Sequence, residues 1–284
     1  MPGPIDLHTH SSVSDGTETP AQLVRAAIEA GMDTIAITDH DSTAGWQMAR
    51  AAASETPLTV IPGMELSTRH GWRSVHLLAY LVDPLNADLV AETARIRSAR
   101  LTRAENIVAR IAADYDLSWD DVLAQTTDGA TVGRPHIADA LVARGHVPTR
   151  SAAFESILHP RTGYFEPHYA PDPLTAVRLV RAAGGVPVLA HPATRGRSAV
   201  MPEDKLKALV DAGLFGLEIE HRENTEDGKV RLRELAKQYG LVATGSSDYH
   251  GDGKPNLLGE NTTTAEVLRQ IVAEGTGSSP FTAA

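Results

Sequence analysis

Cysteine does not occur in the 284-residue chain, which excludes disulfides, thiolate-bound zinc and a cysteine nucleophile. The chain also lacks any apolar run that approaches the length of a membrane span. Its first residues, Met1 to Pro4, do not show the basic and then apolar pattern of a secretory signal. Together these absences predict a cytoplasmic protein that does not bind membranes.

Positive charge is in deficit, because 26 Lys and Arg residues oppose 36 Asp and Glu residues, a formal charge of −10. This deficit argues against the broad basic surface that binds the phosphates of long duplex nucleic acid. It still allows an anionic ligand in a pocket where metal ions reverse the local charge. With 42% hydrophobic residues, the chain can form one large α/β domain, with or without an insertion.

Helices and strands are predicted to alternate towards both ends of the chain. In the first helix, Thr19 is a suitable N-cap, Pro20 suits the first turn and Gly31 is a C-terminal stop. The middle of the chain has helical patterns with little strand character between them. We therefore expect a barrel domain from residues 1–97 and 166–284, and an inserted helical subdomain from residues 98–165.

Histidines and carboxylates gather where apolar strand runs end. His8 and His10 are two apart in one run, and Asp248 and His250 are two apart in another, so each pair points to one side of its strand. Asp15 follows the first of these runs in a Ser-Asp-Gly turn, and three further candidates follow other strands: His40, Glu65 and His191. Active sites of β/α barrels lie at the carboxyl ends of the strands, and closure brings the first strand beside the last. A barrel with a metal cluster is therefore favoured over a doubly wound open sheet.

One strand pair is expected to contribute a ligand from an unusual place. Glu65 lies in a segment that is predicted to pair with residues 75–82 across a turn at residues 69–72. His76 falls in the second strand of this pair, among apolar neighbours. It is either a metal ligand or a hydrogen-bonded core histidine, and we favour the ligand.

Five segments of the chain resemble motifs of the polymerase and histidinol phosphatase (PHP) family of metal-dependent phosphoesterases. In chain order they are His8-Thr9-His10-Ser11, Thr38-Asp39-His40-Asp41, Pro62-Gly63-Met64-Glu65, Ala190-His191-Pro192 and Ser247-Asp248-Tyr249-His250. The resemblance covers nearly the whole chain. It implies an α/β fold, a distorted (β/α)7 barrel of PHP type with a helical insertion, which holds two or three divalent metal ions.

Carried over to this sequence, the resemblance implies three sets of metal ligands. The first set is His8, His10, Glu65 and Asp248, the second is Glu65, His76 and His191, and the third is Asp15, His40 and His250. Nitrogen and oxygen ligands without thiolate suit manganese, iron or zinc. We expect manganese first, and we expect Asp248 and His191 to be essential for catalysis.

Substrate contacts are expected on the helical insertion. The segment Gly133-Arg134-Pro135-His136 resembles the branch that includes nucleoside 3′,5′-bisphosphate phosphatases and small-RNA 5′→3′ exonucleases. Arg134 and His136 are candidate phosphate contacts, because arginine and helix N-termini both bind phosphate. Ordinary surface contacts would explain them equally well.

Three further residues near the motifs have two explanations each. His221 ends a strand and either donates a proton to the leaving group or supports neighbouring side chains. Asp39 is either an ordinary turn or hydrogen-bonding residue or, as we expect, a carboxylate that orients a ligand histidine, as carboxylates beside metal sites often do. Lys254 follows His250 in a glycine-rich loop, and we expect it to be solvated and not to contact substrate.

The predicted reaction is hydrolysis of a phosphate ester by a hydroxide that bridges two metal ions. The best candidate substrate is a nucleoside 3′,5′-bisphosphate, which would give AMP and phosphate from the adenosine compound. Trimming of short 5′-phosphorylated RNA is a further expected activity. The alternatives are a histidinol-phosphate phosphatase and a non-catalytic metal-stabilised module. The complete set of candidate ligands and the lack of an attached polymerase segment favour an enzyme.

Overall fold

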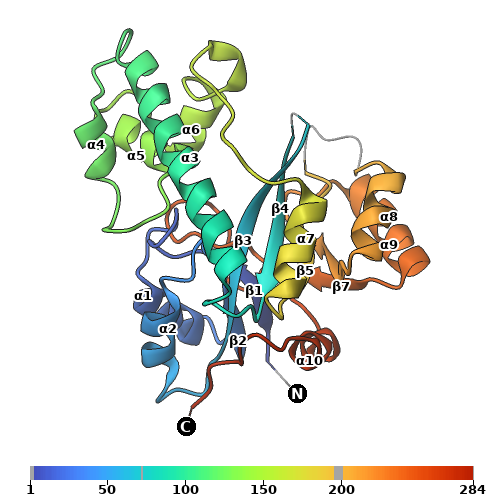
Figure 1. Ribbon diagram of the computed structural model, residues 1–284. Coiled ribbons are helices and arrows are strands. Elements are labelled where there is room, and N and C mark those ends of the chain that lie inside the picture. The colour runs from blue at the N-terminus through green and yellow to red at the C-terminus, as the bar shows by residue number, and fades with distance from the viewer. Residues whose placement is uncertain (1–2, 72, 195–200, 284) are drawn as a thin grey trace.

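The computed structural model describes residues 3–71, 73–194 and 201–283 (Figure 1). Its sheet has seven strands, hydrogen-bonded in chain order. The strands are β1 (Ile5–Thr9), β2 (Thr34–Ile37), β3 (Thr59–His70), β4 (Arg73–Tyr80), β5 (Val186–Ala190), β6 (Gly216–Glu220) and β7 (Val242–Gly245). Trp72, the last residue of the predicted turn at residues 69–72, lies outside the described residues.

The sheet curls into a nearly closed barrel, because the first strand returns to the last. Thr9, the last residue of β1, forms a parallel bridge with Tyr249 in the segment after β7, and the amide of His10 donates to the carbonyl of Tyr249 over 2.8 Å. The amide of Ser247 also donates to the carboxylate of Asp6 on β1 over 3.0 Å. The predicted barrel is confirmed, and the open doubly wound sheet was the wrong alternative.

One strand departs from the parallel pattern, because β4 is antiparallel to both β3 and β5. The predicted strand pair is confirmed, with Glu65 opposite Leu78. The expected position of the ligands at strand ends needs correction for two residues. β3 continues past Glu65 to His70, and His76 lies in the first half of β4. Because β4 runs the opposite way, its first half lies towards the end of the barrel where the parallel strands finish.

Ten α-helices and one short 3-10 helix, η1, occur in the described residues. They are α1 (Pro20–Glu29), α2 (Trp46–Ala53), α3 (Ala87–Ile111), α4 (Trp119–Leu123), α5 (Arg134–Ala143), α6 (Arg150–Glu155), η1 (Pro160–Thr162), α7 (Pro173–Ala182), α8 (Glu203–Asp211), α9 (Glu226–Tyr239) and α10 (Ala265–Glu274). In Figure 1, α3 leads away from the sheet to α4, α5 and α6. No helix in the described ranges is both long and apolar enough to cross a membrane.

Local signals explain how the first helix begins and ends. The Thr19 side chain accepts the amide of Gln22, whose side chain returns to the Thr19 backbone in a capping box, and Pro20 opens the helix. After the helix, Gly31 has a φ of 72°, which glycine adopts without the strain that a Cβ atom would cause. The predicted N-cap and stop of this helix are both confirmed.

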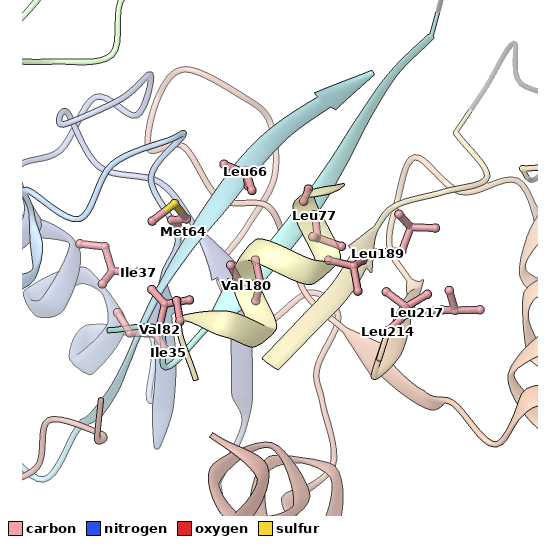
Figure 2. Packing of buried hydrophobic residues seen from close by; sticks show 14 of the residues in the cluster. Ile35, Ile37, Met64, Leu66, Leu77, Val82, Val180, Leu189, Leu214 and Leu217 are labelled. Atoms are coloured by element: carbon pink, nitrogen blue, oxygen red, sulfur yellow. The ribbon is translucent and has the colours of Figure 1, made fainter. Parts of the chain in front are cut away.

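Strand alternation separates an outer apolar layer from the barrel interior. Figure 2 shows Leu66, Leu77 and Leu189 of the strands and Val180 of α7 in the outer layer. The next residue after Leu77, Leu78, belongs instead to the cluster that includes Leu7, Ile61 and Tyr80. Glu65 precedes Leu66, so it lies on the inner face of β3. The apolar layers thus hold Glu65 inside the barrel, where a carboxylate requires a cationic or hydrogen-bonding partner.

A separate apolar cluster lies among the helices of the middle segment. It includes Ile107 and Ile111 of α3, with side chains from α4, α5 and α6. The first half of α3 contributes Leu89 and Ile96 to the outer layer of the barrel. One continuous helix therefore packs against the barrel at its start and against α4–α6 further on.

Candidate metal centre

β1 and the residue that follows it supply two imidazoles to the candidate site, His8 and His10. His8 and His10 are both fully buried, and their Nε2 atoms lie 3.1 Å apart. Two imidazole nitrogens at this separation share one region of space, as the two-residue spacing predicts. The His10 ring also stacks on that of His250, with 4.1 Å between ring centroids. The first and last ligand pairs predicted from the sequence therefore meet.

Glu65 lies at the centre of this group and is 1% exposed. Its Oε1 atom lies 2.6 Å from Nδ1 of His76 and 3.2 Å from Nε2 of His191. Its Oε2 atom lies 3.4 Å from Nε2 of His8, 3.2 Å from Nε2 of His10 and 3.1 Å from Nδ1 of His40. The antiparallel strand β4 thus delivers His76 to the same carboxylate that the parallel strands approach.

Two further carboxylates flank the histidines. Asp248 Oδ1 lies 3.3 Å from Nε2 of His10 and 3.5 Å from Nε2 of His8. Asp15 Oδ1 lies 3.2 Å from Nε2 of His250, and its Oδ2 lies 3.7 Å from Nε2 of His40. All nine residues predicted as metal ligands are therefore brought to one end of the barrel.

Two of these residues have a left-handed backbone, with φ of 28° at His191 and 56° at Asp248. A non-glycine residue in this region costs of order 1–3 kcal/mol and persists only where the surrounding structure enforces it. His191 directly follows β5, and Asp248 lies in the loop shortly after β7. The strained backbone is consistent with a functional role for the two side chains, whose directions it sets.

The arrangement fits divalent metal ions. Four overlapping groups of ligand atoms each lie within 4.8 Å of one another: His8, Glu65 and His191; His8, His10 and Asp248; His10, His40 and Glu65; and His10, Asp15 and His250. In the part of the chain that the structure describes, several of these atoms are buried without a hydrogen bond of suitable geometry, among them Asp15 Oδ1, His40 Nδ1 and His250 Nε2. Buried polar atoms that converge but do not hydrogen-bond suit a cation placed between them.

The ionisation states also suit metal ligation. Burial acts to raise the pKa of Glu65, but the neighbouring His76, His40 and His8 outweigh it and hold that pKa well below its ordinary value. Asp15 and Asp248 are shifted in the same direction, chiefly by His250 and Lys254 respectively, against the effect of burial. Burial lowers the pKa of His40 and of His250, which favours the neutral, metal-binding imidazole.

Glu218 is a site residue that the sequence analysis missed. It is fully buried on β6, its Oε1 lies 3.0 Å from Nδ1 of His8, and its Oε2 accepts the amide of His191 over 2.8 Å. Burial would raise its pKa, but His8 and His221 outweigh burial and lower the pKa to about 2. An ionised carboxylate on Nδ1 leaves Nε2 of His8 free to face the centre. The signal in the sequence was a glutamate between Leu217 and Ile219 in an apolar strand.

Asp39 and His221 occupy supporting positions. The Asp39 carboxylate accepts from Ser11 and from Ser14, and Ser14 Oγ lies 3.3 Å from Nδ1 of His10. The expectation that Asp39 orients a histidine is therefore corrected, because its contact with the His10 ring is indirect. His221 is fully buried, its Nδ1 accepts the amide of Glu223 over 3.1 Å, and its Nε2 lies 3.7 Å from Asp248 Oδ2.

A cavity of about 1090 Å³ adjoins the histidines, and Asp15, His40 and His76 line it. Its other walls carry six cationic side chains: Arg100, Arg103, Arg134, Arg150, Arg222 and Lys254. The sequence analysis named Arg134 and missed the other four arginines, because they come from separate segments of a chain with a net negative charge. The cavity therefore combines a candidate metal site with a cationic lining.

The two predicted substrate contacts differ in position. Arg134 lines the cavity, whereas His136 is not among the described residues that do so. His136 is 4% exposed, and its Nδ1 accepts the amide of Gly133 over 3.1 Å at the start of α5. His136 thus fixes the beginning of the helix that carries Arg134.

Lys254 does not lie where the sequence analysis expected it. It lines the cavity, its side chain is 32% exposed, and its Nζ atom donates to Oδ2 of Asp248 over 2.6 Å. The burial of Lys254 would lower its pKa, but Asp248, Glu223 and Asp15 outweigh burial and raise it. The prediction of a solvated loop lysine was wrong, because the loop folds back over the end of the barrel.

Comparisons with known proteins agree with this geometry. Residues 6–129 match the model of the PHP domain. The chain is 31% identical to the 3′,5′-nucleoside bisphosphate phosphatase of Chromobacterium violaceum (88% of each chain covered) and 32% identical to the 5′-3′ exoribonuclease Rnm of Salmonella typhimurium (86% and 84%). It is 34% identical to the phosphoribosyl 1,2-cyclic phosphate 1,2-diphosphodiesterase of Eggerthella lenta (87% and 94%).

A solved structure extends the agreement to three dimensions. A protein of Bifidobacterium adolescentis, described as a metal-dependent phosphoesterase, is 42% identical, with a TM-score of 0.93 over 96% of both chains. The expectation of an enzyme is thus confirmed over that of a non-catalytic module. The buried histidines and carboxylates at one end of the barrel are the residue types that a metal-dependent enzyme needs as ligands. The chain belongs to the PHP domain family and is a metal-dependent phosphoester hydrolase.

Proposed function

We propose that this enzyme hydrolyses phosphate esters of small nucleotides and that its best candidate substrate is a nucleoside 3′,5′-bisphosphate. The observation that carries the proposal is the cavity, in which a group of buried arginines faces the same space as the candidate metal ligands. A substrate with two phosphates can bind one at the metal ions and the other at the arginines. The product from adenosine 3′,5′-bisphosphate would be AMP with inorganic phosphate.

Two arginines of α3 form the centre of the proposed second phosphate site. Arg100 and Arg103 are 6% and 7% exposed. An Nη1–H of Arg100 donates to Ser67 Oγ over 2.9 Å, and an Nη1–H of Arg103 donates to Nδ1 of His168 over 2.9 Å. Within residues 3–71, 73–194 and 201–283, the Nε atoms of both arginines make no hydrogen bond. A buried guanidinium with donors to spare is stabilised by an anion, and phosphate suits its planar fork.

The charge balance of Arg103 supports this site. Arg100 has Asp41 as a partly neutralising neighbour, with Nη1 3.6 Å from its Oδ2. Arg103 forms no ion pair within the described part of the chain. Burial, together with Arg100 and Arg134, lowers its pKa well below the ordinary value. A bound phosphate would supply the negative charge that this cluster lacks.

Arg134 completes the wall from the start of α5. Its guanidinium lies 5.2 Å from the ring centroid of Phe154 and 5.1 Å from that of Phe165. Burial and the charge of Arg100 lower the pKa of Arg134 to about 10. The two rings hold the guanidinium in place, so it loses little freedom when phosphate binds. We retain Arg134 as a substrate contact and assign His136 to the support of α5.

The metal ligands are proposed as three sets. The first is His8, His10, Glu65 and Asp248, the second is Glu65, His76 and His191, and the third is Asp15, His40 and His250. When bound, divalent ions such as manganese, iron or zinc would polarise the phosphate and lower the pKa of water towards ~7. Glu218 would hold the His8 ring, and Asp248 and His191 would fix the ligand geometry. We propose that residues 98–165 form a helical subdomain and that it supplies Arg100, Arg103 and Arg134 to the cavity beside the metal ligands.

A comparison of substrates tests the proposal. We expect manganese-dependent phosphate release from adenosine 3′,5′-bisphosphate, with AMP as the second product, and loss of activity with a chelator. Short 5′-phosphorylated RNA and histidinol phosphate should be run beside it. Turnover of histidinol phosphate alone would overturn the nucleotide assignment, and release of nucleotides from the RNA would add the trimming activity.

Phosphoribosyl 1,2-cyclic phosphate is the second candidate substrate. The relative that is named for its hydrolysis is 34% identical, and the match covers 94% of that relative. This compound also has two phosphate groups, so the same cavity could accept it. Hydrolysis of the cyclic phosphate at a kcat/KM above that of the bisphosphate would replace the first candidate by this one.

A further inference from the structure

Lys254 and His221 approach the same oxygen of Asp248 from different surroundings. Lys254 Nζ lies 2.6 Å from Asp248 Oδ2, and His221 Nε2 lies 3.7 Å from it. The other oxygen, Oδ1, faces His8 and His10. Oδ1 of Asp248 thus faces the candidate metal ligands. Oδ2 lies near the ammonium of Lys254 and the imidazole of His221.

The two groups differ in their access to the cavity. His221 is fully buried and is not among the described residues that line the cavity. Lys254 lines it, together with Asp15 and His40 of the candidate metal centre. A buried histidine beside Asp248 can only support that carboxylate. A cavity-lining lysine can also contact what the cavity holds.

The loop that carries Lys254 is held against the barrel, so the position of its ammonium is defined. The side chain of Asn256 is buried and donates to the carbonyl of Ser247 over 2.6 Å. The amide of Gly259 donates to Oδ2 of Asp6 on β1 over 3.0 Å. The segment after Lys254 is thus bonded to Ser247, next to Asp248, and to β1, and before Lys254 the amide of Gly253 donates to the carbonyl of His250 over 3.3 Å.

The ammonium group has more donors than Asp248 uses. It carries three N–H groups. Across the described ranges, the hydrogen bonds of its side chain are with Asp248 alone. The remaining donors are available to an acceptor in the cavity. The acceptor that a phosphoester hydrolase places beside its metal ligands is an oxygen of the phosphate that is transferred.

We propose that Lys254 is a catalytic residue of this hydrolase, and that its ammonium binds an oxygen of the phosphate at the metal centre while it holds Asp248. No proton transfer is required of it, since its role is to stabilise the negative charge of the phosphate. The inference rests on phosphoester hydrolysis at this centre and not on which nucleotide is the substrate. It gives Lys254 a substrate contact that the sequence analysis did not expect, and it is separate from the proton donation that was considered for His221.

The variants Lys254→Met and Lys254→Arg test this role. Lys254→Met keeps an unbranched side chain that is one atom shorter, and it removes the charge and the N–H donors. A lost hydrogen bond to a charged group corresponds to about a 10- to 100-fold change. We therefore expect the metal-dependent part of orthophosphate binding, measured by calorimetry on the loaded protein, to weaken by this factor. kcat/KM should fall at least as far, bound metal per chain should stay unchanged, and Lys254→Arg should recover part of both.

The matched control is Lys207→Met, because that lysine is 59% exposed on α8 and pairs with Asp211. It should behave as the parent protein. Two outcomes would overturn the proposal: orthophosphate binding unchanged in Lys254→Met, or metal lost from that variant with activity restored by excess metal, which would mean that Lys254 only positions Asp248. Orthophosphate is the probe because its binding can be measured even if the proposed nucleotide is not hydrolysed.

Discussion

Glu65 and His76 meet diagonally across an antiparallel strand pair, with 2.6 Å between Oε1 and Nδ1. The register places Glu65 opposite Leu78 and Ser67 opposite His76, so the two are diagonal neighbours on one face of the sheet. Side chains at this spacing are within reach when they are long. The one antiparallel strand of the barrel thereby adds a fifth histidine to a carboxylate that four others already approach.

Glu65→Gln should therefore remove most of the bound metal. The amide keeps the shape of the side chain but loses the charge that balances the ions, and buried ligands are left without a partner. We expect activity to fall by at least ~100-fold and bound metal per chain, measured by elemental analysis, to decrease. The control is Glu55→Gln at an exposed position. Full metal content in the Glu65 variant would contradict its central role.

Glu218→Gln tests whether the carboxylate behind His8 matters. Partners of ligand histidines typically change metal affinity or activity by about 10- to 100-fold. Glu220→Gln is a matched control on the same strand, because Glu220 pairs with Arg233 near the surface. We expect only the first variant to need a higher manganese concentration for half-maximal activity. Equal metal requirements in the two variants would show that Glu218 has no such influence.

Arg103→Gln should discriminate between substrates with one and two phosphates. If Arg103 binds the second phosphate, KM for adenosine 3′,5′-bisphosphate should rise by about 10- to 100-fold. The KM for adenosine 3′-phosphate should change little. Arg110→Gln is the control, because Arg110 lies on the same helix and pairs with Glu166 at 44% exposure. The second phosphate site would have to be placed elsewhere if both substrates were affected alike.

Metal affinity should increase with pH up to about 9. Burial lowers the pKa of His10, but Asp248 and Glu65 outweigh it and raise that pKa to about 9 in the protein without metal. A metal ion binds the neutral imidazole, so below this pH it must displace a proton. The apparent affinity should then rise by up to about tenfold per pH unit for each proton released. Manganese titrations by calorimetry at about pH 6.5 and pH 8 check this, and equal affinities at both values would contradict it.

Tyr80→Phe should destabilise the barrel. Tyr80 is fully buried in the interior, and its hydroxyl donates to the carbonyl of Leu7 on β1 over 2.9 Å. Its removal leaves that carbonyl without this partner at a cost of about 1–2 kcal/mol in the free energy of unfolding. Urea unfolding of the protein without metal measures the change. Tyr239→Phe, which removes an exposed hydroxyl contact with Glu203, should have a much smaller effect.

Some parts of the site were open to prediction from sequence because their geometry is local. Residues two apart in an extended segment face the same way, so the pairing of His8 with His10 follows from spacing. Asp248 and His250 lie in the loop after β7, and the left-handed backbone at Asp248 means that their meeting depends on the loop and not on strand spacing. The barrel follows from the alternation of elements and from the match between the first and last motifs. Glu218 escaped notice because a single glutamate in a short apolar strand has no spacing pattern of its own.

The sequence by itself determined the barrel, the strand pair that carries Glu65 and His76, and the nine side chains that gather at one end. These features depend on periodicity and on motifs of a few residues, which the chain order preserves. Only the tertiary structure decided the cationic cavity and the position of Lys254. Arg100, Arg134 and Lys254 lie on α3, α5 and the loop after β7, and long-range packing alone brings them to one cavity. No local sequence pattern predicts that these three side chains share a cavity, because their positions depend on how the middle helices and the last loop fold over the barrel.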